Sequence, residues 1–183
     1  MNENDSEFLL SKRGGLRVPN HSQKDIGAQV RRKLFQLGIK SDERNSGICS
    51  LIPQGGVILD VGCGKGELGV EIARLTNCKL AQADCLDQRD WEYKYEFLKM
   101  KRDKINLPPE WQKFADVVLL IDVLQHVRSK LDYLKSLLSA LSDENGKIIV
   151  AFTNNSGNYL QNDTNFWQVV KNDPELSGKI FML

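Results

Sequence analysis

The chain has 183 residues, of which 41% are hydrophobic and 27% are charged, and its formal net charge is +1. This composition fits one soluble globular domain, and the near-zero charge provides no general attraction to nucleic acid or to an anionic membrane. No apolar run has the ~18 to 20 residues that a membrane span needs, and the acidic N-terminal stretch is unlike a signal or transit peptide. We therefore expect a cytoplasmic protein, either monomer or homodimer, with no membrane partner.

Cysteine and histidine usage bears on metals and disulfides. The four cysteines and two histidines are Cys49, Cys63, Cys78, Cys85, His21 and His126, and no two of the cysteines form a C-x-x-C pair. Structural zinc sites use paired ligand spacing, so we expect no metal site. The absence of an export signal favours reduced thiols over disulfides.

The N-terminal part is predicted to be an irregular segment followed by helices. Residues 1–20 are polar and are expected to be flexible. Residues 22–37 carry apolar side chains at helical spacing, which predicts an amphipathic helix, and a second short helix is expected over residues 42–52. We expect residues 21–55 to form a helical lid, whose cations face either solvent or RNA phosphates.

From residue 56 onward, apolar strand-like runs alternate with helical patterns. The predicted strands are residues 57–61, 79–83, 93–100, 116–122 and 147–152, and the predicted helices between them are residues 67–75 and 130–141. Strands that alternate with helices pair in parallel through right-handed crossovers. Residues 56–183 are therefore predicted to form one doubly wound, mostly parallel α/β domain.

Three glycines, Gly62, Gly64 and Gly66, follow the first of these strands and precede its helix. Glycines in such a turn let a ligand approach the main chain, and the helix N-terminus attracts an anion. Two ligand classes fit this loop. The pattern G-x-G-x-x-G from Gly64 to Gly69, with an acid 20 positions after Gly64, is typical of NAD(P)-binding domains. Asp60, however, would repel a pyrophosphate and attract an amino-acid ammonium group.

Four segments in a fixed order bear on which of these ligands is bound. VILDVGCGKG, LAQADCLDQ, FADVVLLIDVLQHV and LLSALSDENGKIIVAF follow one another between residues 56 and 154. Their order and spacing resemble the class I S-adenosylmethionine-dependent methyltransferases, in particular methyltransferase domains of types 11 and 25. The resemblance implies a Rossmann-like fold, S-adenosylmethionine as cofactor, and in-line transfer of its methyl group to an O, N, S or C acceptor.

The C-terminal end departs from the pattern of that family. The family sheet usually has seven strands and ends in an antiparallel hairpin, whereas about 31 residues follow Phe152 here, with one predicted helix over residues 164–171 and one short strand over 179–183. Either the chain is a fragment or its sheet is trimmed to five or six strands. Phe166 and Trp167 are expected to cover the sheet edge or the acceptor site.

The resemblance implies cofactor contacts at the loop and at the ends of successive strands. The implied residues are Asp60, Gly62, Cys63, Gly64, Gly66, Asp84, Cys85, Leu86, Asp103, Lys104, Asp122 and Val123. Asp60 would place the ammonium group, Asp84 would accept from both ribose hydroxyls, and Asp103 would accept from the adenine amino group. No catalytic residue is assigned, because a base is needed only if the acceptor must lose a proton.

Each assignment has an alternative. Asp60 could cap the turn, Asp87 could replace Asp84, and Asp103 could be an ordinary surface acid. His126 could be a general base or could only line the pocket. The chain is either an active enzyme, with a small molecule ahead of protein or RNA as acceptor, or a methyltransferase-like binding or regulatory subunit. An NAD(P)-binding domain is the remote third hypothesis.

Overall fold

The computed structural model describes residues 16–17, 41–89, 95–101, 103, 105–152 and 158–183. Two sequence-based predictions, the helix over residues 22–37 and the cofactor contact of Lys104, lie outside the described residues. Within the part that is described, no helix has both the length and the apolar character needed to cross a membrane.

Strands and helices alternate along the chain as predicted. The elements are β1 (Leu16–Arg17), α2 (Ser41–Ser50), β2 (Val57–Val61), α3 (Glu67–Leu75), β3 (Lys79–Asp84), β4 (Glu96–Lys99), the 3-10 helix η3 (Pro109–Trp111), β5 (Val117–Ile121), the 3-10 helix η4 (Leu124–His126), α4 (Lys130–Leu138), β6 (Lys147–Ala151), α5 (Asn158–Gln161), α6 (Thr164–Asn172) and β7 (Ile180–Met182). Most of them begin and end within one or two residues of their predicted bounds.

The strands form one sheet in the order β1-β3-β2-β5-β6-β7, with β4 also paired to β3. All pairs are parallel except β1 with β3. The direction of the strand order reverses between β2 and β5, which makes their carboxyl ends the topological switch point where such sheets bind ligands. The predicted doubly wound, mostly parallel α/β fold is confirmed.

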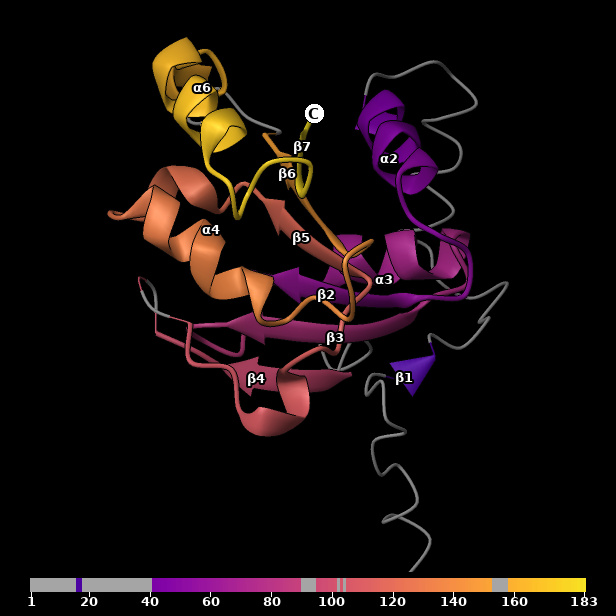
Figure 1. Ribbon diagram of the computed structural model, residues 1–183. Helices are drawn as coiled ribbons and strands as arrows, with labels where there is room; N and C mark the ends of the chain where they lie inside the picture. Colours follow the sequence, from indigo (N-terminus) through magenta and orange to yellow (C-terminus); the bar gives the residue numbers. More distant parts are fainter. Residues whose placement is uncertain (1–15, 18–40, 90–94, 102, 104, 153–157) are drawn as a thin grey trace, which may run out of the picture.

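Helices cover both faces of the sheet (Figure 1). Apolar residues of α2 and α3 pack on one face, whereas those of α4, α5 and α6 pack on the other. The central strands are therefore apolar on both sides, and β2 is buried along its whole length. This explains why β5 is a continuous apolar run and why β2 is apolar except for Asp60, rather than alternating.

Three boundaries differ from prediction. Residues 16–17, inside the stretch expected to be irregular, pair with the start of β3. The third predicted strand, residues 93–100, is shorter as β4, and residues 93–94 lie outside the described part. Helix α4 ends at Leu138 rather than Leu141, because the carbonyl groups of the following turn accept hydrogen bonds from residues 113–115, just before β5.

The C-terminal residues extend the sheet. β7 pairs in parallel with β6, which differs from the antiparallel pairing that the resemblance implied for the last strands. Phe166 and Trp167 pack against the core, with the Trp167 ring 6.4 Å from that of Phe152 and 4.9 Å from that of Phe166. The indole N–H donates to the carbonyl of Leu160 at 2.7 Å. These contacts favour the core role of the two aromatic residues over a role in the acceptor site.

Candidate functional site

A cavity of about 320 Å³ lies at the carboxyl ends of β2, β3 and β5. Its walls are formed by Gly62, Asp84, Cys85, Met100, Asp122, Val123, His126, Val127 and Tyr133. The cavity is at the switch point of the sheet, where the fold leaves room for a ligand. It brings together predicted residues from the ends of three strands.

The loop after β2 is shaped by its glycines. Gly62 has a φ of 74° and donates to the carbonyl of Ala83 at 2.6 Å. A side chain at position 62 would overlap the Val123 side chain, so glycine is required both by conformation and by space. Gly66 has a φ of 85° and is the N-cap of α3.

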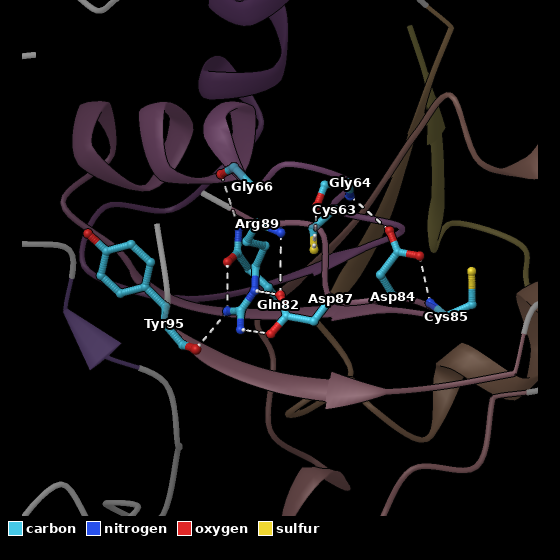
Figure 2. Close-up of polar contacts among 9 residues, drawn as sticks. All are labelled: Cys63, Gly64, Gly66, Gln82, Asp84, Cys85, Asp87, Arg89 and Tyr95. Atoms are coloured by element: carbon cyan, nitrogen blue, oxygen red, sulfur yellow. Dashed lines mark hydrogen bonds and ion pairs between the residues drawn. The ribbon is translucent and has the colours of Figure 1, made fainter. Parts of the chain in front are cut away.

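Asp84 joins this loop to the end of β3. Its Oδ2 accepts from the backbone N–H of Gly64 at 2.8 Å, and its Oδ1 accepts from that of Cys85 at 2.6 Å (Figure 2). A carboxylate has about four lone-pair sites, so each oxygen can still accept from a ligand in the cavity. The alternative acid, Asp87, does not line the cavity and forms an ion pair with Arg89 at 2.8 Å.

Asp60 lies behind the loop rather than in the cavity wall. Its side chain is buried against α3, where a Cβ at Gly69 would overlap the carboxyl group. Burial, and then the charge of Asp84, raise the pKa of Asp60 to about 7, while a hydrogen bond from Gln82 acts in the opposite direction. Gly69 is therefore explained by helix–sheet packing, and the G-x-G-x-x-G spacing gives no independent support for a dinucleotide.

Other predicted contacts lie around the cavity rather than in its wall. Leu86 is 54% exposed. Asp103 is exposed and accepts from the backbone N–H of Arg128 at 3.1 Å. Cys63 is half-buried beside the loop, and the pKa of its thiol is raised by burial and then by the nearby acids, Asp60 first. A raised pKa keeps the thiol protonated and unreactive.

The segment after β5 forms the opposite wall. Asp122 has a φ of 56° and donates its N–H to the carbonyl of Ala151 at 2.9 Å. His126 lies at the end of η4 and is exposed. Among the described residues, none is hydrogen-bonded to its imidazole, so the geometry supports a lining role for His126 but contains no oriented acid–base pair.

Sequence reasoning missed Met100, Val127 and Tyr133. The Tyr133 hydroxyl is buried and has no hydrogen-bond partner among the described residues, and the pKa of the phenol is raised by burial and by the charge of Asp84. Tyr133 lies four residues before Leu137 on the buried stripe of α4. That spacing is the signal that could have placed it facing the sheet.

The described residues contain no group of three or more His, Cys, Asp or Glu side chains that could hold a metal ion. All four cysteines are free thiols, and only Cys78 is fully buried. The cavity wall offers carboxylates, backbone groups, the imidazole of His126, the phenol of Tyr133 and apolar side chains. Such a set suits the hydroxyl groups and apolar rings of a nucleoside.

Comparison with known proteins adds a family match. The family model described as methyltransferase domain matches residues 30–176. The chain is also similar to a solved structure described as a methyltransferase from an antibiotic biosynthesis pathway of Anabaena variabilis, with 20% identity and a TM-score of 0.50 over 60% of this chain and 44% of that one. At 20% identity, this likeness supports the fold alone.

Two further solved structures have lower scores. They are the [4+2]-cyclase SpnF, with 16% identity and a TM-score of 0.48 over 58% of this chain and 43% of that one, and an S-adenosylmethionine-dependent methyltransferase from Mesorhizobium loti, with 20% identity and a TM-score of 0.42 over 53% of this chain and 48% of that one. The chain thus spans less than half the length of each of the three structures. No curated protein matches it.

Proposed function

Because the chain belongs to the methyltransferase domain family, whose model matches residues 30–176, we propose that it is an S-adenosylmethionine-dependent methyltransferase. The observation that carries the proposal is Asp84, which is presented in the cavity by two backbone N–H groups. The pairing holds the carboxylate in one orientation while leaving lone pairs for a ligand. Two adjacent hydroxyl groups, as on a ribose, match this acceptor.

The described residues fit the cofactor in three respects. Asp84 and Cys85 form the wall at the end of β3, where the nucleoside would bind. Gly62 gives the ligand access to the main chain, and Asp122 and Val123 form the wall on the side of β5. Asp60 lies outside the wall, so it would attract the ammonium group without direct contact, and only in its ionised form.

When bound, S-adenosylmethionine supplies a methyl group that its positively charged sulfur has already activated. The residues of this chain then have to hold the acceptor in line with that group and exclude water. Positioning of this kind lowers a barrier by about 7 kcal/mol or more when the reacting atoms are held at near-attack distance. The described residues around His126 include no oriented acid–base pair, and such a site is sufficient for acceptors that are nucleophilic without losing a proton.

We favour a small-molecule acceptor, because the cavity of about 320 Å³ has the dimensions of a small-molecule site. Protein and RNA acceptors are the alternatives. A second candidate function is a methyltransferase-like module that binds the cofactor and acts as a binding or regulatory subunit. The lack of an oriented acid–base pair at His126 among the described residues favours this candidate.

Isothermal titration calorimetry with S-adenosylmethionine and S-adenosylhomocysteine tests the cofactor. We expect the wild-type chain to bind both and Asp84→Ala to bind them about 100-fold more weakly, since two hydrogen bonds to a charged group are lost. Asp143→Ala is the matched control, because Asp143 is exposed in the turn before β6, at the other end of the strands. Wild-type binding of NAD⁺ but of neither sulfur compound would overturn the proposal.

A turnover assay separates the enzyme from the binding module. Production of S-adenosylhomocysteine with a panel of small-molecule thiols, amines and phenols is expected for the enzyme. Binding of S-adenosylmethionine with no turnover on small molecules, on RNA or on protein acceptors would favour the regulatory subunit. Alkylation of Cys85 gives an independent readout of the site, because this half-exposed thiol lines the cavity and bound cofactor should protect it.

A further inference from the structure

A buried guanidinium lies on the side of the glycine loop that faces away from the cavity. The Arg89 side chain is 4% exposed and holds Asp87 through two bonds, Nε to Oδ1 at 2.8 Å and Nη2 to Oδ2 at 3.0 Å. Its Nη1 donates to the carbonyl of Tyr95 at 2.7 Å, and its plane lies 4.3 Å from the ring centroid of Phe97. Arginine is seldom buried unless it is paired in this way.

Gln82 connects this guanidinium to the loop. The side chain is completely buried, its Oε1 accepts from Arg89 at 3.2 Å, and its Nε2 donates to the carbonyl of Gly66 at 3.1 Å (Figure 2). A Cβ at Gly66 would lie 2.9 Å from that Nε2. The third glycine of the loop is therefore required by its contact with Gln82, and Gly66 is not among the residues that line the cavity.

The strand register explains how these side chains meet. Gln82 is paired with Asp60 on β2 and with Phe97 on β4, so the three side chains share the face of the sheet that α3 covers. The brace, as we name Gln82, Asp87 and Arg89, thus ties the N-terminus of α3 to β3 and β4. The opposite side of the same loop carries Gly62 in the cavity wall.

Stability alone gives little reason for such a brace. The Arg89 side chain is 4% exposed and that of Asp87 is 41% exposed, so the burial falls on the guanidinium, and a buried charge loses solvation that its ion pair barely repays. Hydrogen bonds do, however, fix the position of a particular backbone group, and a site that is fixed before binding does not lose ordering entropy when the ligand arrives. The group fixed here is the Gly66 carbonyl, at the first turn of α3.

We propose that Gln82 and Arg89 are positioning residues for cofactor binding, which hold the glycine loop and the N-terminus of α3 in the shape that receives the cofactor's amino-acid end. The inference rests on the proposed function. We assign the amino-acid end to this part of the loop because its carboxylate is an anionic group, which a helix N-terminus attracts. The nucleoside end is held elsewhere, at Asp84.

The test compares two ligands on three variants. S-Adenosylhomocysteine has the amino-acid end, and 5′-methylthioadenosine lacks it. Gln82→Leu removes the hydrogen bonds of the amide to Gly66, Arg89 and Asp60, and Arg89→Lys keeps the charge but loses the forked contacts. Gln168→Leu is the matched control, because Gln168 is exposed on α6 and, within the described part of the chain, its side chain donates a hydrogen bond to Asn172. Dissociation constants are measured by calorimetry at a temperature where melting curves show every variant to be folded.

We expect Gln82→Leu to bind S-adenosylhomocysteine about 10-fold more weakly and Arg89→Lys about threefold more weakly. Binding of 5′-methylthioadenosine should change less than twofold, and Gln168→Leu should bind both ligands like the wild type. If Gln82→Leu does not fold, Arg89→Lys decides the outcome. Lower melting temperatures with unchanged dissociation constants, or equal weakening of both ligands, would overturn the inference. Failure of the wild type to bind either ligand would overturn the proposed function as well.

Discussion

Asp60 and Asp84 lie near the carboxyl ends of the neighbouring strands β2 and β3. Their surroundings, on opposite sides of the glycine loop, are nevertheless very different. Asp60 is 4% exposed and packed behind the loop, where burial raises its pKa to about 7. Asp84 lines the cavity and accepts from two backbone N–H groups. The difference shows that an acid next to such a loop can either pack behind the loop and support it or face the cavity and be available to a ligand. The surrounding donors determine which.

The largest effect should come from removing the charge behind the loop. The pKa of Asp60 is about 7 when folded against 3.8 ordinarily, so between pH 4 and 7 the folded chain keeps a proton that the unfolded chain has lost. Its stability therefore falls as pH rises through this range, by about 4 kcal/mol in total. Asp60→Asn should remove this slope and raise the free energy of unfolding at pH 8 by a similar amount, as measured by urea denaturation from pH 4 to 8.

Asp143→Asn is the control for that titration, since its exposed side chain lies at the other end of the strands. Equal stability of Asp60→Asn and the wild type at pH 8 would mean that Asp60 is ionised without cost. The contrast with Asp84 would then disappear.

A second contrast lies within the loop itself. At position 62, a Cβ would overlap the Val123 side chain, and the backbone φ is 74°. At position 64, a Cβ would meet nothing within 4 Å, so only the backbone φ of 55° is unfavourable. Gly62→Ala should lower the free energy of unfolding by about 3 kcal/mol and Gly64→Ala by about 1 kcal/mol. Denaturation of both variants measures the difference. Equal decreases in the free energy of unfolding would show that the Val123 side chain moves aside and does not exclude a side chain at position 62.

Much of the fold could be predicted because its central strands are simple. β5 is apolar along its whole length, and the runs that became β2 and β6 are apolar except for Asp60 and Lys147, as expected of strands buried between two helical layers. β4 was placed less well because it lies at the edge of the sheet, and its partly exposed side chains give a weaker pattern. The end of α4 was missed because hydrogen bonds from residues 113–115, distant in the chain, terminate the helix.

The site was predictable where it follows from strand ends. Asp84 and Asp122 could be placed in one cavity because parallel strands end at the same edge of the sheet. Tyr133 could not, since it comes from a helix whose rotation relative to the sheet depends on packing. Nor could the sequence show that Asp103 bonds to the backbone of Arg128, or that Asp60 faces α3. Side-chain direction at a strand end depends on neighbours that are far away in sequence.

The backbone of the cavity wall at position 122 has a conformation that favours the residue type found there. Asp122 has a φ of 56°, a conformation that aspartate and asparagine tolerate better than other residues with a Cβ. Asp122→Ala should therefore lower the free energy of unfolding by about 1 kcal/mol, whereas Asp122→Asn should change it by only a few tenths. Urea denaturation at pH 7 compares the two. If the asparagine variant loses as much as the alanine variant, the carboxylate charge and not the backbone determines the residue.

The smallest effect is expected at Tyr133, the residue of the wall that comes from α4. Its buried hydroxyl has no partner among the described residues, so Tyr133→Phe should leave the stability of the free chain unchanged or raise it by less than about 1 kcal/mol. Tyr159→Phe is the matched comparison, because that hydroxyl donates to the carbonyl of Gln125 at 2.8 Å and its removal should cost about 1 kcal/mol. A loss at Tyr133 as large as at Tyr159 would mean that the hydroxyl is satisfied in the free protein. If Tyr133→Phe is stable but binds cofactor less tightly, the cavity wall keeps a polar group for its ligand, whereas the buried Gln82 and Arg89 behind the loop are hydrogen-bonded within the fold.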